Sequence, residues 1–178
     1  TENRKKYPLK KVPPHVKFPN SDSYYEEAKS YVNNYFSDHI GTLTDNPLYP
    51  TCFESTKDWL QQFFDHRFFE FGDYEDAILK ENSILNHSVL TPMLNVGLIE
   101  PKEIIDDCLN YVKTQNIPIN SSEGFVRQIV GWREFIRGIY ISRGDVERTK
   151  NFWKFKKKIP QSFYNGSTGI HPIDDTIK

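Results

Sequence analysis

Two arginines lie one helical turn apart in the segment EGFVRQIVGWREFIRGIY, residues 123–140. If the segment is helical, the guanidinium groups of Arg133 and Arg137 repel by about 0.2–0.5 kcal/mol, and Glu134 offsets only part of this. A bound anion near Arg133 would remove the repulsion, and a guanidinium group suits phosphate well. The alternative is that Arg133 packs its aliphatic stem at the margin of an apolar face and keeps its charge in water.

The same segment has an apolar face, with Gln128 and Arg133 on its opposite margins and Gly131 and Gly138 together on the far side. Each glycine inside a helix costs about 1 kcal/mol relative to alanine. The aligned glycines therefore predict a groove where another backbone comes close, and a helix buried on two sides. The apolar face comprises Phe125, Ile129, Trp132, Ile136, Ile139 and Tyr140. We interpret Trp132 as a core residue.

A basic run follows this helix. It has two aromatic residues, Trp153 and Phe155, between its charges. Basic residues with interleaved aromatics could contact a DNA backbone; the alternative is a solvated loop. The basic members are Arg148, Lys150, Lys154, Lys156, Lys157 and Lys158.

Apolar residues recur at three- and four-residue steps along most of the chain, and no stretch shows sustained period-two alternation, so we predict an all-α fold. Four prolines make residues 1–22 an extended, basic arm, which we interpret as a linker remnant, followed by a helical region over 23–178. Long helices are expected at about 23–40, 55–70, 101–114 and 123–140, with short ones after Thr91–Pro92, ending at Gly97, and from about Asp174. Ser55, Thr91 and Asp174 are expected N-caps. The buried faces are expected to include Trp59, Leu60, Phe63, Phe64, Phe68, Ile104, Ile105, Cys108, Leu109 and Val112.

Composition excludes several classes of protein. The net charge of −1 over 178 residues gives no global basic field, and aromatic residues make up 15% of the chain. No apolar run approaches the roughly 18 residues of a membrane span, and the first residues contain no signal-peptide core. Cys52 and Cys108 have no metal-ligand spacing, so we expect two reduced thiols in a cytoplasmic protein and no metal site. The chain ends where a helix should open, so we expect a fragment.

Three motifs in order resemble the photolyase/cryptochrome flavoprotein family. WREF at 132–135 is similar to its helix signature, HSVLTPMLNVGLI at 87–99 to its hydroxyl-bearing segment, and GSTGIHPIDDTI at 166–177 to a later turn. FGDYEDA at 71–77 and NVGLIEP at 95–101 resemble the bacterial iron–sulfur branch, the prokaryotic (6-4) photolyases. The resemblance implies the first part of a helical FAD-binding domain with long loops. It also implies that the family's N-terminal α/β domain and its later helices, with the cluster cysteines, lie outside this chain.

The resemblance implies roles for individual residues in FAD binding. Ser88 and Thr91 would offer hydroxyl groups to the flavin pyrophosphate, helped by backbone N–H groups at the start of the following helix. Arg133 would face the phosphates and the ribityl chain. His87 would donate to phosphate, or is an internally satisfied imidazole. Tyr74 would lie against the cofactor, or only pack in the core.

Gln128 resembles a residue near the adenine or the lesion. Compared with the commoner family pattern, however, Gly131 adds one residue between Gln128 and Trp132. Gln128 would keep its direction only if a π-bulge absorbs the extra residue.

The implied function is light-driven repair of (6-4) photoproducts in DNA. Reduced, excited flavin would pass one electron to a lesion flipped out of the duplex. The alternatives are a cryptochrome-type blue-light photoreceptor, or an isolated helical fragment without activity. Expected partners are FAD, damaged DNA and the remaining parts of the parent chain. The 178 residues alone are expected not to hold flavin tightly, and their exposed apolar surface could drive homodimerisation.

Overall fold

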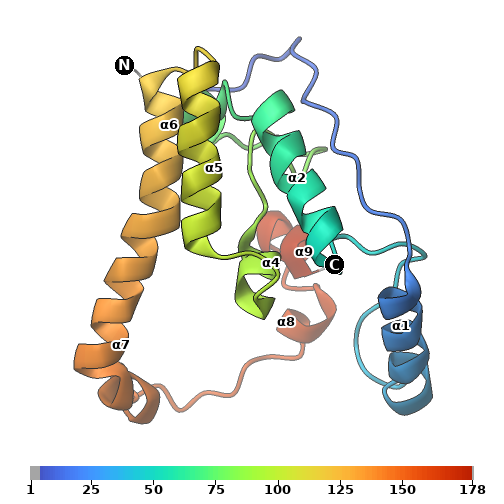
Figure 1. Cartoon of the computed structure of the whole chain (residues 1–178). Coiled ribbons are helices and arrows are strands. Elements are labelled where there is room, and N and C mark those ends of the chain that lie inside the picture. The colour runs from blue at the N-terminus through green and yellow to red at the C-terminus, as the bar shows by residue number, and fades with distance from the viewer. Residues whose placement is uncertain (1–4, 178) are drawn as a thin grey trace.

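The computed structural model describes residues 5–177, and this part of the chain is all-α, as predicted (Figure 1). Its only β-type pairing within those residues is an isolated bridge between Leu79 and Asn82. The helices are α1 Ser23–Tyr35, α2 Phe53–His66, α3 Phe71–Tyr74, α4 Thr91–Val96, α5 Pro101–Thr114, α6 Ile119–Val126, η1 Arg127–Gly131 (a π-helix), α7 Trp132–Thr149, α8 Ser162–Asn165 and α9 His171–Ile177.

The core is an aromatic cluster built on α2. The five residues predicted for its buried face are at most 3% exposed, which confirms their burial. The helix ends at His66 rather than near residue 70, so Phe68 lies just beyond it. Phe63 lies at the centre, with its ring centroid 4.9 Å from that of Phe125 and 5.9 Å from that of Phe71. Because these partners lie in α6 and α3, burial of one phenylalanine side chain joins three helices.

Helix α5 packs beside α2 and α6 (Figure 1). Its bounds are those predicted from Pro101 and the acidic first turn. Ile104 and Cys108 are fully buried, whereas Leu109 is 47% exposed, so its place on the inner face was wrong. Leu109 follows Cys108 directly, and the 100° step between them turns its side chain away from the core.

Helix α1 corrects two expectations. It ends at Tyr35, five residues before Ile40, and none of its residues is buried. Its aromatic side chains contact one another: the rings of Tyr31 and Tyr35 are 4.7 Å apart. In Figure 1 the helix stands at the edge of the molecule, so its periodic pattern does not mark a core-facing side.

Helix α2 starts two residues earlier than predicted. Cys52 is the N-cap, and Ser55 is the third helical residue, whose hydroxyl group accepts from the Cys52 backbone N–H. Ser55 therefore belongs to a capping box rather than forming the cap itself.

The helix expected over 123–140 is the middle of a longer rod, α6–η1–α7, which ends at Thr149 (Figure 1). No backbone packs against its glycines: nothing lies within 4 Å of a Cβ placed on Gly138, and only the Arg127 side chain lies near Gly131. Gly144 is the only buried residue of α7, and Trp132 is 58% exposed. The predictions of a two-sided burial and of Trp132 in the core were wrong, because no described element covers α7.

Close contact between α3 and α6 depends on Gly72. A Cβ atom at this position would lie 2.5 Å from the backbone carbonyl carbon of Asn120. The Gly72 N–H donates to the Ser121 hydroxyl, whose own proton goes to the Phe69 carbonyl (2.9 and 2.8 Å). Glycine therefore lets α6 dock on α3, which sets the direction of the rod.

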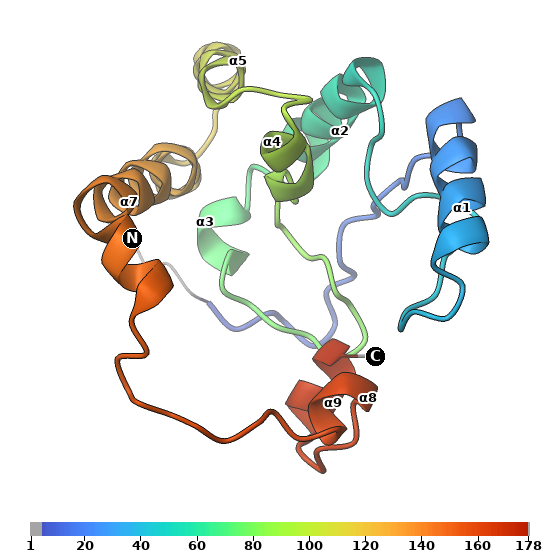
Figure 2. The ribbon, with the colours of Figure 1, turned by 90° about the horizontal axis from the view of Figure 1, so that it is seen from below.

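The two ends of the described chain differ in how they pack. Residues 5–22 contain no helix, as predicted, and Tyr7 is buried against Tyr74. Figure 2 shows α8 and α9 apart from α7 and joined to it by a long loop. Asp174 lies inside α9 rather than at its N-cap; its carboxylate accepts from the backbone N–H groups of Thr168 and Gly169, which form the expected turn. Among the described residues, no helix combines the length and apolar character needed to cross a membrane.

Burial of Cys108 gives a pH prediction. Desolvation raises the pKa of its thiol from 9.0 to about 11, so the unfolded chain ionises first as the pH rises. The stabilisation is therefore complete below pH 9 and is lost as the pH rises through about 11. We expect the urea midpoint to fall between pH 9 and 11 more steeply than in Cys108→Ala. Equal slopes in the two proteins would contradict this.

Iodoacetamide should label the half-buried Cys52 well before the buried Cys108.

Candidate functional site

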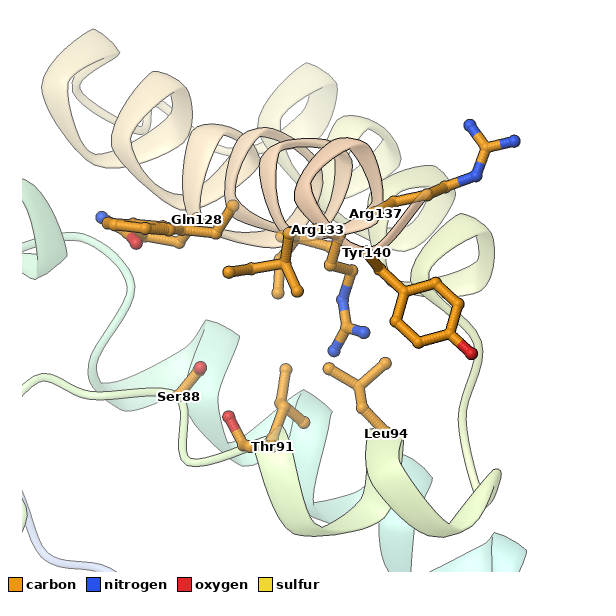
Figure 3. Close-up of a pocket in the computed structure, with 11 residues that line it drawn as sticks. Ser88, Thr91, Leu94, Gln128, Arg133, Arg137 and Tyr140 are labelled. Carbon is orange, nitrogen blue, oxygen red and sulfur yellow. The ribbon is translucent and has the colours of Figure 1, made fainter. Parts of the chain in front are cut away.

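A cleft of about 690 Å³ separates the α4 segment from the rod (Figure 3). Four of the six residues predicted to bind FAD line it: Ser88 and Thr91 on one wall, Gln128 and Arg133 on the other. The remaining lining residues are largely apolar: Leu90, Leu94, Ile129, Trp132, Ile136, Arg137 and Tyr140.

Arg133 and Arg137 behave differently although they lie one turn apart. The guanidinium group of Arg133 reaches across the cleft toward Thr91 and Leu94, whereas that of Arg137 points away from it (Figure 3). Arg137 donates to Glu134 at 3.2 Å. Within residues 5–177, the half-buried Arg133 side chain makes no hydrogen bond or ion pair. Arg133 therefore presents an uncompensated positive charge to the cleft.

The opposite wall supplies two hydroxyl groups that point toward the cleft (Figure 3). Neither the Ser88 nor the Thr91 hydroxyl has a hydrogen-bond partner in the described part of the chain. Thr91 was expected to be an N-cap, but Leu90 holds that position and Thr91 is the first helical residue. Its hydroxyl is thus not used for capping. Because α4 has only six residues, its dipole adds little to the cleft.

The extra residue in the rod is absorbed by a π-helical turn. Residues 127–131 form η1, and Gln128 on this turn lines the cleft together with Ser88. Gln128 was expected to face the site only if a π-bulge absorbed the extra residue, and η1 meets this condition. The wider turn shifts the register of Gln128 relative to Arg133, so that both lie along one cavity.

His87 and Tyr74 lie outside this cleft. The Nδ1 atom of His87 accepts from the Leu85 N–H at 3.2 Å, so Nε2 carries the proton and donates to the Glu75 carbonyl at 3.0 Å. His87 is therefore an internally satisfied imidazole. Tyr74 is 8% exposed and packs between the Tyr7 ring and the ammonium group of Lys11, in a separate cluster. The predicted cofactor contact of Tyr74 gains no support from this arrangement, whereas His87 lines an adjoining hollow of about 270 Å³ together with Ser88 and Gln128.

The sequence predicted that Trp59 is buried, but it predicted no role at the site for Trp59 or for Arg67. Trp59 donates from Nε1 to the Ser88 carbonyl, and Arg67 donates from Nε to the His87 carbonyl, each at 3.0 Å. Arg67 is fully buried although it follows α2 as a charged residue. The sequence signal for a buried Arg67 was its place among aromatic residues in FFDHRFF, residues 63–69.

The cleft can bind an anion that is joined to an apolar group. One guanidinium group, two hydroxyl groups and an amide converge on it, and apolar side chains cover the remaining surface. Among residues 5–177, no group of three or more His, Cys, Asp or Glu side chains could hold a metal ion.

Several known proteins or families have sequences similar to this chain. Residues 1–47 match the family described as deoxyribodipyrimidine photo-lyase-related protein. A (6-4) photolyase of Agrobacterium fabrum is 31% identical over 156 residues, which cover 88% of this chain and 31% of that protein. Protein R853 of Acanthamoeba polyphaga mimivirus, named as uncharacterized, is 41% identical over 106 residues, 58% of this chain and 80% of that protein.

The described residues form an all-helical fold with a cleft lined by one guanidinium group, two hydroxyl groups, an amide and apolar side chains. The chain is thus similar to the photolyase-related family over residues 1–47 and to one (6-4) photolyase over most of its length. It spans about a third of the length of the (6-4) photolyase that it matches.

Proposed function

We propose that this chain forms the phosphate-holding wall of an FAD site in a light-driven DNA repair photolyase of the (6-4) type. One observation carries the proposal: the Arg133 guanidinium, which has no partner in the described structure, faces the Ser88 and Thr91 hydroxyl groups across one cleft. The (6-4) photolyase of Agrobacterium fabrum supports the choice of lesion.

The residues present fit a flavin dinucleotide. Arg133 would donate paired hydrogen bonds to the linked phosphates, and the hydroxyl groups of Ser88 and Thr91 would donate from the other side. Ile129 and Ile136 would exclude water from the less polar part of the ligand. When bound, the flavin supplies the light-driven electron transfer to the lesion.

The two cysteines of the chain do not fit an iron–sulfur cluster. Cys108 is fully buried among apolar side chains in α5, and Cys52 is the N-cap of α2. A cubane cluster needs four thiolates close together. We therefore assign no cluster ligand to the described residues, and a cluster of the iron–sulfur branch would be held by other residues.

The test is repair by the full-length gene product that carries these residues. We expect purified protein to contain FAD and to convert a (6-4) oligonucleotide back to pyrimidines under blue light but not in the dark. Bound FAD without repair would favour the photoreceptor alternative. Absence of FAD after reconstitution would overturn the proposal and leave an inactive helical protein.

A further inference from the structure

Hydrogen bonds hold three residues that lead into the cleft to α2 and to its C-cap residue Arg67: Asn86, His87 and Ser88. The Asn86 amide donates to the Arg67 carbonyl at 3.0 Å, and both Asn86 and Arg67 are fully buried. Arg67 and Trp59 then donate to two consecutive carbonyl groups, those of His87 and Ser88. Each residue of this short segment is thus held by at least one hydrogen bond to Trp59 or Arg67.

The next residue adopts an unfavourable backbone conformation. Val89 has φ of 53°, in the left-handed region that a β-branched side chain rarely enters. Leu90, directly after it, is 2% exposed in the core. Such a conformation persists only where the neighbouring structure holds it. Before Val89, Trp59 and Arg67 hold the backbone by hydrogen bonds to the carbonyl groups of Ser88 and His87. After it, burial of Leu90 holds the chain in the core.

Arg67 is a costly anchor. No carboxylate pairs with it within residues 5–177, and its Nη2 atom has no hydrogen-bond partner there. Its guanidinium lies over the rings of Trp59 and Phe63, 5.8 Å from each centroid, and burial lowers its pKa to about 10. An apolar side chain would fill the same space without a buried charge. The guanidinium donates to the Gln62 side chain at 3.2 Å and to the His87 carbonyl, and the second bond fixes the backbone beside Ser88.

We infer that Trp59 and Arg67 are positioning residues, which hold the Ser88 hydroxyl toward the cleft by hydrogen-bonding the carbonyl groups of Ser88 and His87. The ligand atoms that Ser88 meets would be the flavin phosphates, so this inference rests on the proposed function. Neither Trp59 nor Arg67 lines the cleft itself, and each would act on the ligand through Ser88.

A double-mutant cycle in the full-length gene product tests this role. Trp59→Phe removes the indole N–H and keeps an aromatic ring. We expect it to weaken FAD binding about three- to tenfold, the range for one lost hydrogen bond. In a Ser88→Ala background, where no hydroxyl remains to be positioned, the same change should weaken binding by less than about twofold. Equal losses in both backgrounds would overturn the inference.

Hydrogen–deuterium exchange of the ligand-free protein gives a second readout. Trp59→Phe should speed exchange in a peptide covering residues 86–90, whereas the control Trp153→Phe, at a 71% exposed tryptophan, should not. Unchanged exchange in Trp59→Phe would also overturn the inference. Arg67→Met should act in the same direction, and Trp59→Phe keeps the test possible if that variant fails to fold.

The outcomes separate the inference from the proposed function. If Arg133→Ala and Ser88→Ala leave FAD binding unchanged, both fail. If these two variants weaken binding but the cycle is additive, only the positioning role fails.

Discussion

Phe63→Ala should lower the free energy of unfolding by about 3–5 kcal/mol, the range for deleting a buried phenylalanine ring. The side chain is fully buried, and its ring packs against those of Phe64, Phe68, Phe71 and Phe125. The loss includes the transfer energy of the ring and a cavity term, because rings held by three separate helices cannot all move inward. Urea denaturation followed by far-UV circular dichroism measures it.

Phe53→Ala is the matched control, because Phe53 lies in the same helix and is 61% exposed. Its substitution should change the free energy of unfolding by no more than about 0.5 kcal/mol. Similar losses for the two variants would show that the cluster around Phe63 is not the core of the protein in solution.

Arg133→Ala should weaken FAD binding by about 10- to 100-fold in the full-length gene product. A hydrogen bond that involves a charged group contributes about 1.5–3 kcal/mol, and each 1.4 kcal/mol corresponds to a factor of ten. The free protein should not be destabilised, since Arg133 has no described hydrogen-bond or ion-pair partner to lose. Arg133→Lys should recover part of the affinity, because an ammonium group keeps the charge but not the planar fork.

Arg137→Ala provides the control on the same helix. Its guanidinium points away from the cleft and pairs with Glu134, so we expect FAD binding to change by less than about twofold. Equilibrium dialysis with flavin fluorescence measures both variants. Equal losses for Arg133→Ala and Arg137→Ala would indicate a general effect of positive charge and would remove Arg133 from the site.

Local sequence signals determined the helices whose ends carry specific residues. Pro101 and the acidic first turn set α5, and Gly97, with φ of 78°, ends α4 as predicted. The buried face of α2 followed from its 3.6-residue period. These features depend on contacts within a few residues, so one segment of sequence contains the information that decides them.

Local sequence patterns did not predict which residues of α1 and α7 are buried. Both helices have apolar residues at helical spacing, yet none of α1 and only Gly144 of α7 is buried. Periodicity shows which side of a helix is apolar, but another element must be present to cover that side. For Trp132, the described chain supplies none.

The sequence by itself determined the all-α class, the aromatic core of α2 and the chemical types that a phosphate site would need. Only the tertiary structure decided which of those residues meet. It brings Ser88, Thr91, Gln128 and Arg133 to one cleft and leaves His87 and Tyr74 outside. The physical reason is that the close docking of α6 on Gly72 and the π-turn at 127–131 set the direction of the rod, whereas Trp59 and Arg67 fix the opposite wall from behind. These contacts join residues far apart in the chain, and no local pattern encodes them.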